Sequence, residues 1–375
     1  MKQFLLFLCF VSIHSCAEKK QNLNFLEIAL SSENPKIKKV VDNLERHEVQ
    51  IRYTQIDRIN DSVIFTDYDF QVNDNMYFYP ASTVKFPTAV LALEKLSKTD
   101  SLSMQTKYYV EGDTIESTIA QDITEIFAVS DNLANNRLVE FLSFDSINTS
   151  LKNKGISPLR LSHRLGHHSD DLRTKPIIIY LNDSTTGITQ PILNTVPRKL
   201  KLLKTEKGSG FIEDDRLINS PFDFSLKNYY PISSQHALLK RVIFPQNFDS
   251  REVFDLSTEQ RQYLLKAMHT VPRNVGYDSN TYYDGYCKFY LYGDTKEQIP
   301  DHIKIYNKVG FAYGTLTDCA YIKDTDNDID FLLTATILVN KDGIFNDDAY
   351  EYDEIGIPFL AQLGREIYQL ELKRK

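Results

Sequence analysis

The sequence lacks an excess of positive charge, a run of basic residues and, beyond its first residues, any apolar stretch long enough to cross a membrane. Its formal net charge is −8, which argues against a nucleic-acid partner. Cysteine is also scarce, because only Cys287 and Cys319 follow Cys9 and Cys16. The spacing of these two matches no metal-site pattern, so they either pair in a disulfide or remain separate buried thiols.

The first residues have the features of an export signal. Lys2 is followed by an apolar run from Phe4 to Val11 that is too short to remain a membrane helix. Ile13-His14-Ser15-Cys16 then resembles a bacterial lipobox, although histidine is unusual there. We expect a signal peptide over 1–15, lipidation of Cys16, a tether over 17–34 and a membrane-anchored lipoprotein facing the periplasm. The alternative is ordinary secretory cleavage, with Cys16 incidental.

Hydrophobic periodicity predicts one folded unit over residues 35–375 of the 375-residue chain. Helical spacing is found at 35–44, after Ser82, and at 119–129, 132–142, 234–243, 258–269 and 352–372. Strand-like runs lie at 47–53, 62–70, 177–181, 303–308, 317–322 and 329–339. This order predicts an α+β fold: an antiparallel sheet built from both chain ends and flanked by helices, with an inserted, mainly helical lobe.

The chain's only Ser-x-x-Lys is Ser82-Thr83-Val84-Lys85, at the predicted start of a helix. On a helix the serine and lysine share a face, so a buried lysine with a lowered pKa can take the hydroxyl proton. Taken alone, the pair is also consistent with two ordinary exposed helix residues.

Two further short motifs occur later in the chain. Ser130-Asp131-Asn132 separates two predicted helices, where the same residues would also serve as a helix cap. Lys308-Val309-Gly310 ends an apolar strand. Lys341-Asp342-Gly343 has the same Lys-x-Gly form, but it follows Asn340 in a polar turn, where a structural role suffices.

The three motifs together resemble the serine β-lactamase and penicillin-binding protein superfamily, most closely the class A β-lactamases. That family carries Ser-x-x-Lys, Ser-Asp-Asn and Lys-Thr-Gly in this order. Phe78 and Pro80 before the serine, and the apolar run 126–129 before Ser-Asp-Asn, agree with it. The resemblance extends from about residue 35 to the end, with an atypical insertion at about 166–229.

The resemblance implies a role for each motif residue. Ser82 is the acylated nucleophile, Lys85 its base, and Ser130 the group that passes a proton to the leaving nitrogen. Lys308 supplies positive charge, and Asn132 binds the substrate's amide side chain. The backbone N–H groups of Ser82 and of Phe311, which follows Gly310, form the oxyanion hole. No metal or cofactor is implied, and the expected partner is a small-molecule or peptide substrate, such as a β-lactam or a cell-wall-like peptide.

The sequence departs from the family at two positions. Val309 replaces the threonine or serine whose hydroxyl binds a β-lactam carboxylate. Gly166 falls where class A enzymes carry the glutamate that activates the deacylating water. Substitute bases lie nearby, namely His163, His167 and Asp170, with His168 and Asp171 beside them. The histidines lack the further ligands of a zinc site, and 324–328 lacks the glycine and glutamate of a calcium loop.

We therefore expect a β-lactamase-like serine hydrolase that acts through an acyl-Ser82 intermediate on amide or β-lactam bonds. One alternative is a D,D-peptidase or another amidase or esterase of the same fold. An alternative of another class is a catalytically silent envelope lipoprotein that binds a ligand or partner. The joint presence of Ser82, Lys85, Ser130 and Lys308 favours the enzyme.

Overall fold

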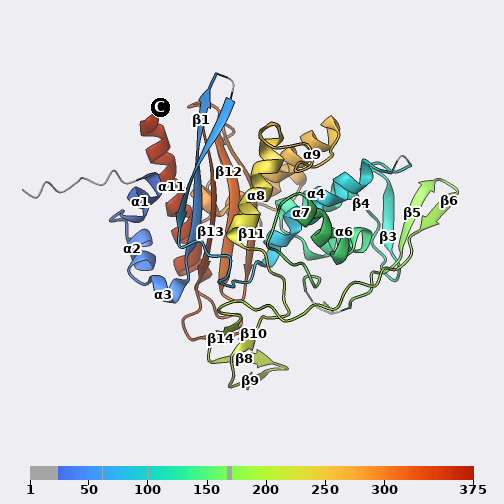
Figure 1. Ribbon diagram of the computed structural model, residues 1–375, viewed down its shortest axis with the longest axis horizontal. Helices are drawn as coiled ribbons and strands as arrows, with labels where there is room; N and C mark the ends of the chain where they lie inside the picture. The colour runs from blue at the N-terminus through green and yellow to red at the C-terminus, as the bar shows by residue number, and fades with distance from the viewer. Residues whose placement is uncertain (1–23, 61, 100, 167–170) are drawn as a thin grey trace, which may run out of the picture.

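The centre of the fold is a five-stranded antiparallel sheet with the strand order β11-β12-β13-β1-β2 (Figure 1). The computed structural model describes residues 24–60, 62–99, 101–166 and 171–375. Strand β1 pairs with β13, from Gln50 opposite Thr336 to Gln55 opposite Phe331, which confirms a sheet built from both chain ends. The strands are β1 (Gln50–Ile59), β2 (Ser62–Phe70), β11 (Ile303–Ala312), β12 (Thr315–Asp324) and β13 (Ile329–Leu338).

Helices cover both faces of this sheet (Figure 1). Strands β12 and β13 are buried along almost their whole length, as expected for strands covered on both faces. One face carries α1 (Phe25–Leu30), α2 (Pro35–Val41), α3 (Leu44–His47), α10 (Phe289–Tyr292) and α11 (Ile357–Arg374). The other is covered by α8 (Ile232–Ile243) and α9 (Thr258–His269). The helical lobe packs against these helices and consists of α4 (Lys85–Leu96), α5 (Ile119–Ala128), α6 (Asn132–Leu142) and α7 (Phe144–Asn153). The predicted α+β architecture is confirmed.

The region expected to be an atypical insertion forms small sheets with distant parts of the chain. Strand β5 pairs with β3, and β8 pairs in parallel with β14 near the C-terminus. Of the strands between 166 and 229, sequence periodicity predicted β5 alone. The elements are β3 (Lys107–Val110), β4 (Ser117–Thr118), β5 (Ile177–Asn182), β6 (Thr185–Ile188), β7 (Glu206–Lys207), β8 (Gly210–Glu213), β9 (Arg216–Ile218), β10 (Phe222–Asp223) and β14 (Ile344–Phe345).

Several expectations need correction. Part of the expected tether over 17–34 is helix α1, whose Leu26 and Ala29 are buried against the core. Strand β11 continues to Ala312 instead of ending at Lys308. Cys287 and Cys319 are both free and buried, so the disulfide alternative is wrong.

The export signal and the lipidated cysteine stay predictions. The predicted signal peptide and Cys16 lie outside the described residues. Within the residues that are described, no helix combines the length and the apolar character needed to cross a membrane.

A buried ion pair holds the junction of α5 and α6. Arg137 on α6 donates to Asp122 on α5 through Nε at 2.9 Å and Nη2 at 2.6 Å. The Asp122 carboxylate is fully buried and also accepts from Tyr108 on β3 and Ser117 on β4. Four elements therefore meet at one carboxylate, close in sequence to the turn that contains Ser130.

We predict that Arg137→Met destabilises the protein by about 3–5 kcal/mol, because it leaves the Asp122 charge buried without its ion partner. The measurement is the free energy of unfolding in urea. The matched control is Lys107→Met, which removes one member of the exposed Lys107–Glu116 pair and should cost at most about 1 kcal/mol. Equal losses in the two variants would contradict this assignment.

Candidate active site

Ser82 lies in a short 3-10 turn, Ala81–Val84, that leads directly into α4. The turn is closed by Thr83, whose backbone N–H and hydroxyl donate to the Pro80 carbonyl oxygen at 3.1 and 2.7 Å. Lys85 is the first residue of α4, and its side chain is fully buried. Ser82 thus lines a surface cleft, whereas the Lys85 side chain points into the protein.

Ser130 lies in the turn between α5 and α6. Asp131 caps α6 by accepting the Ala134 N–H at 2.7 Å, and Asn132 is the first residue of that helix. The motif is therefore a helix cap as well as a source of polar side chains. Ser130 has a φ of +59°, and Ala81, beside Ser82, has +46°. Non-glycine residues rarely adopt this conformation, which costs of order 1–3 kcal/mol and is concentrated at functional sites.

The structure brings the three motifs together at the Ser130 side chain. Lys85 Nζ donates to Asn132 Oδ1 at 2.7 Å and to Ser130 Oγ at 3.3 Å, and also to the Ser130 carbonyl oxygen. Lys308 Nζ donates to Ser130 Oγ at 2.8 Å and to the Val309 carbonyl oxygen at 2.8 Å. Two ammonium groups therefore share one hydroxyl. Lys308, and not Lys341, is the third-motif lysine at this site.

Gly310 allows β11 to approach the turn that contains Ser82. A Cβ atom at this position would lie 2.6 Å from the Pro80 carbonyl oxygen and 3.0 Å from the backbone nitrogen atoms of Ser82 and Thr83. Any larger residue would push the strand away from the turn that contains Ser82. Phe311 follows on the same strand and lines the cleft beside Ser82. Val309 is buried in the apolar core on the α11 side.

Burial determines the electrostatics of the two lysines. It lowers the pKa of Lys85 well below that of a free lysine, and the charge of Lys308 lowers that pKa further. Burial also lowers the pKa of Lys308 to about 8, against the opposing effects of Cys287 and Asp318. Desolvation disfavours the charged form of each amine. Lys85 is thus suited to accept a proton, while Lys308 remains mostly charged at neutral pH.

The cleft at Ser82 has a volume of about 500 Å³. A Cβ atom on Gly166 would lie 3.8 Å from Asn132 Nδ2, so the backbone at Gly166 passes beside the site without presenting a side chain. Residues that sequence reasoning did not place here are Tyr79, Lys227, Tyr313, Asn346, Asp348, Tyr350 and Tyr352. All but Tyr352, which begins a helical turn over Tyr352–Gly356, come from segments outside helices and strands, where hydrophobic periodicity gives no signal. The tyrosine-rich stretch 277–292 contributes none of the described residues that line the cleft.

Of the substitute bases, His163 lies at the cleft. Its ring stacks on Tyr79 with centroids 6.1 Å apart, and its Nδ1 lies 2.6 Å from the Arg164 carbonyl oxygen. His167 and Asp170 lie outside the described residues. Asp171 accepts the Arg173 N–H at 2.8 Å.

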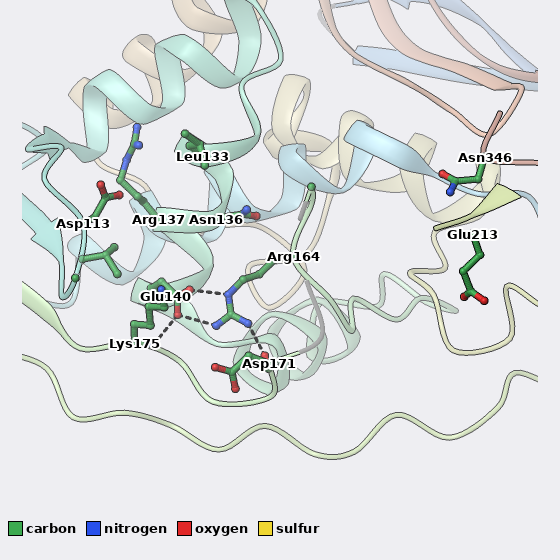
Figure 2. Close-up of a pocket in the computed structure, with 13 residues that line it drawn as sticks. Asp113, Leu133, Asn136, Arg137, Glu140, Arg164, Asp171, Lys175, Glu213 and Asn346 are labelled. Atoms are coloured by element: carbon green, nitrogen blue, oxygen red, sulfur yellow. Dashed lines mark hydrogen bonds and ion pairs between the residues drawn. The ribbon is translucent and has the colours of Figure 1, made fainter. Parts of the chain in front are cut away.

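A buried pair of Arg164 and Glu140 fixes the chain after Gly166 to α6 (Figure 2). Arg164 donates to both carboxylate oxygens of Glu140, through Nε at 2.6 Å and Nη2 at 2.8 Å. It also donates to the carbonyl oxygens of Asp171 and Arg173. The pair lines a second cavity that shares Arg164, Gly166 and Asn346 with the cleft. A glutamate on the apolar side of the helix predicted over 132–142 was the available sequence signal for this pair.

Comparisons with known proteins support the fold described above. A family model described as the β-lactamase enzyme family matches residues 34–191, a range that includes Ser82 and Ser130. A search of the curated proteins found no match. A β-lactamase from Sphaerobacter thermophilus DSM 20745 is 13% identical, with 92% of this chain and 96% of that chain covered and a TM-score of 0.50. A β-lactamase from Burkholderia ambifaria is 14% identical, with coverages of 88% and 96% and a TM-score of 0.50. At these identities the likeness to the solved structures is one of fold.

We predict an acylation rate that rises with pH as Lys85 loses its proton and falls above about pH 8 as Lys308 loses its charge. The measurement is the second-order rate constant for acylation by a penicillin across the pH range. Lys308→Arg keeps a positive charge at every accessible pH, so the fall on the alkaline side should disappear in this variant. An unchanged alkaline fall in Lys308→Arg would contradict the assignment.

Proposed function

Because the chain has a β-lactamase-like serine hydrolase fold, we propose that it is a hydrolase of the class A type, cleaving amide or β-lactam bonds through an acyl-Ser82 intermediate. The proposal is carried by one observation: the buried amines of Lys85 and Lys308 both donate to the Ser130 hydroxyl, and the cleft that contains Ser82 also contains Asn132, which binds Lys85. Such an arrangement is costly to build, since each buried amine loses its hydration, and a purely structural role does not require it.

The geometry supports a two-stage reaction. Neutral Lys85 takes the Ser82 hydroxyl proton, and Ser82 Oγ forms a bond to the substrate carbonyl carbon. Backbone N–H groups at Ser82 and Phe311 stabilise the oxyanion, an effect worth about 3 kcal/mol for each donor. Ser130 then gives its hydroxyl proton to the leaving nitrogen as the C–N bond breaks, and takes in its place the proton that Lys85 received from Ser82. Water must later release the acyl group from Ser82.

A second candidate function, a D,D-peptidase-like enzyme with a long-lived acyl form, is favoured by Gly166. The backbone of Gly166 passes beside Asn132, and glycine offers no carboxylate of its own to activate water at that position. The Val309 side chain lies in the core, so it offers no hydroxyl to a β-lactam carboxylate. Losing one such charge-assisted hydrogen bond costs roughly 1.5–3 kcal/mol of recognition. Both features favour a reaction that stops, or slows, at the acyl-enzyme.

We predict that a chromogenic cephalosporin gives a burst of about one equivalent per protein, followed by slow turnover, because acylation has its catalytic groups and deacylation lacks the expected base. Rapid-mixing absorbance measures both phases. Ser82→Ala should abolish the burst. Ser97→Ala, which removes a hydroxyl bound to the carbonyl oxygens of Glu94 and Asp255 at the far end of α4, should retain it. A burst that survives in Ser82→Ala would contradict the proposal.

A further inference from the structure

Behind the candidate active site lies a buried bridge of three polar side chains. Lys288 Nζ donates to Asn307 Oδ1 at 2.7 Å, and Asn307 Nδ2 donates to Asp318 Oδ1 at 2.8 Å. All three residues are almost completely buried. A lysine and an aspartate are thus joined through an amide, inside the protein. None of the three belongs to the motifs that the sequence indicated.

The bridge ties the third-motif strand to its surroundings. Asn307 directly precedes Lys308 on β11, which is an edge strand, and Asp318 lies opposite Val309 on β12. Lys288 also donates to the Met268 carbonyl oxygen at the end of α9, at 2.8 Å. The bridge therefore links β11, β12 and α9 at the residue next to Lys308.

The Asp318 carboxylate is held from several sides. It accepts the backbone N–H of Phe289 at 3.1 Å, while Tyr290 donates to the carbonyl oxygen of the same aspartate at 2.9 Å. Asn307 Nδ2 donates in addition to the Cys287 carbonyl oxygen at 2.9 Å. A carboxylate fixed in this way cannot turn toward water, so its charge acts on the amines around it.

The balance of charge at this place is unusual. Two buried amines, Lys288 and Lys308, lie near one buried carboxylate, Asp318, and Lys308 in turn acts on a third buried amine, Lys85. Burial lowers the pKa of Lys288 to about 8, and the charge of Lys308 contributes. Because repulsion between two ammonium groups is mutual, Lys288 also disfavours the charged form of Lys308. The other titratable groups that face these amines are Asp131 before α6, His269 on α9 and the Cys287 thiol.

We propose that Lys288, Asn307 and Asp318 form a charge-balancing bridge that positions Lys308 and sets its protonation: the Asp318 carboxylate stabilises the Lys308 ammonium group, and the Lys288 ammonium group opposes it. These are positioning residues, since none of them lines the cleft. The consequence for acylation rests on the proposed function, whereas the effect on Lys308 itself does not.

The test is an NMR titration of protein labelled with ¹³C at the lysine Cε atoms, with the Lys308 signal identified by its loss in Lys308→Arg. Lys288→Met should raise the Lys308 midpoint by about one pH unit, and Asp318→Asn should lower it by about one, since a neighbouring charge shifts a pKa by this order. The alkaline fall of the acylation rate should move in the same two directions. The double variant should return close to the wild-type midpoint.

The two variants are expected to shift the Lys308 titration midpoint in opposite directions. A merely structural role would not give this result, because loosening the fold would shift the midpoint in the same direction in both variants. Lys207→Met, which removes a buried lysine paired with Glu48, is the matched control and should leave the Lys308 midpoint unchanged. Where Lys288→Met does not fold, Lys288→Gln removes the charge and keeps a hydrogen-bond donor. Lys308 midpoints that do not shift, or that shift in the same direction in both variants, overturn the proposed role of the bridge. Midpoints that move as expected without any acylation overturn the proposed function alone.

Discussion

Two buried ammonium groups, those of Lys85 and Lys308, donate to the single hydroxyl of Ser130. Removing each amine from water costs several kcal/mol, and the two charges repel each other. Hydrogen bonds to Asn132 and to backbone carbonyl oxygens offset part of that cost. The part of the desolvation cost that these bonds do not offset lowers the pKa of both lysines. For Lys85, a lowered pKa is the property that the proposed proton transfer from Ser82 requires.

This contact depends on the rest of the fold, because its members come from three distant parts of the chain. The central sheet pairs β1 with β13 and carries β11 at one edge (Figure 1). Lys308 on β11 reaches Ser130 of the helical lobe. Gly310 permits the close approach of β11 to the Ser82 turn. The Asp122–Arg137 pair fixes the two helices on either side of the Ser130 turn. Local sequence places each motif on its element, and tertiary packing supplies the distances.

The contrast between local sequence and tertiary packing also explains which elements the sequence could predict. The helices at 132–142 and 258–269 were predicted with their observed bounds, because a strong apolar period and capping residues mark them. Apart from β5, the strands of the region 166–229 were not predicted, since they are short and are held by distant partners, such as β14 for β8, and by aromatic contacts between Phe222, Phe224 and Tyr313. Helix α1 was taken for a tether because its six residues are too few to show a helical period and polar residues lie on both sides of it. The buried Lys288–Asn307–Asp318 bridge has no local pattern at all.

The central claim is that Ser82 is the nucleophile, activated by the buried lysine beneath it. Intact-protein mass spectrometry after exposure to a penicillin tests it most directly, with peptide mapping to locate the adduct. The account predicts one added acyl group per protein, on the peptide that contains Ser82, and none in Ser82→Ala. An adduct on another residue, or no adduct with either a penicillin or a general serine-hydrolase probe, would contradict it.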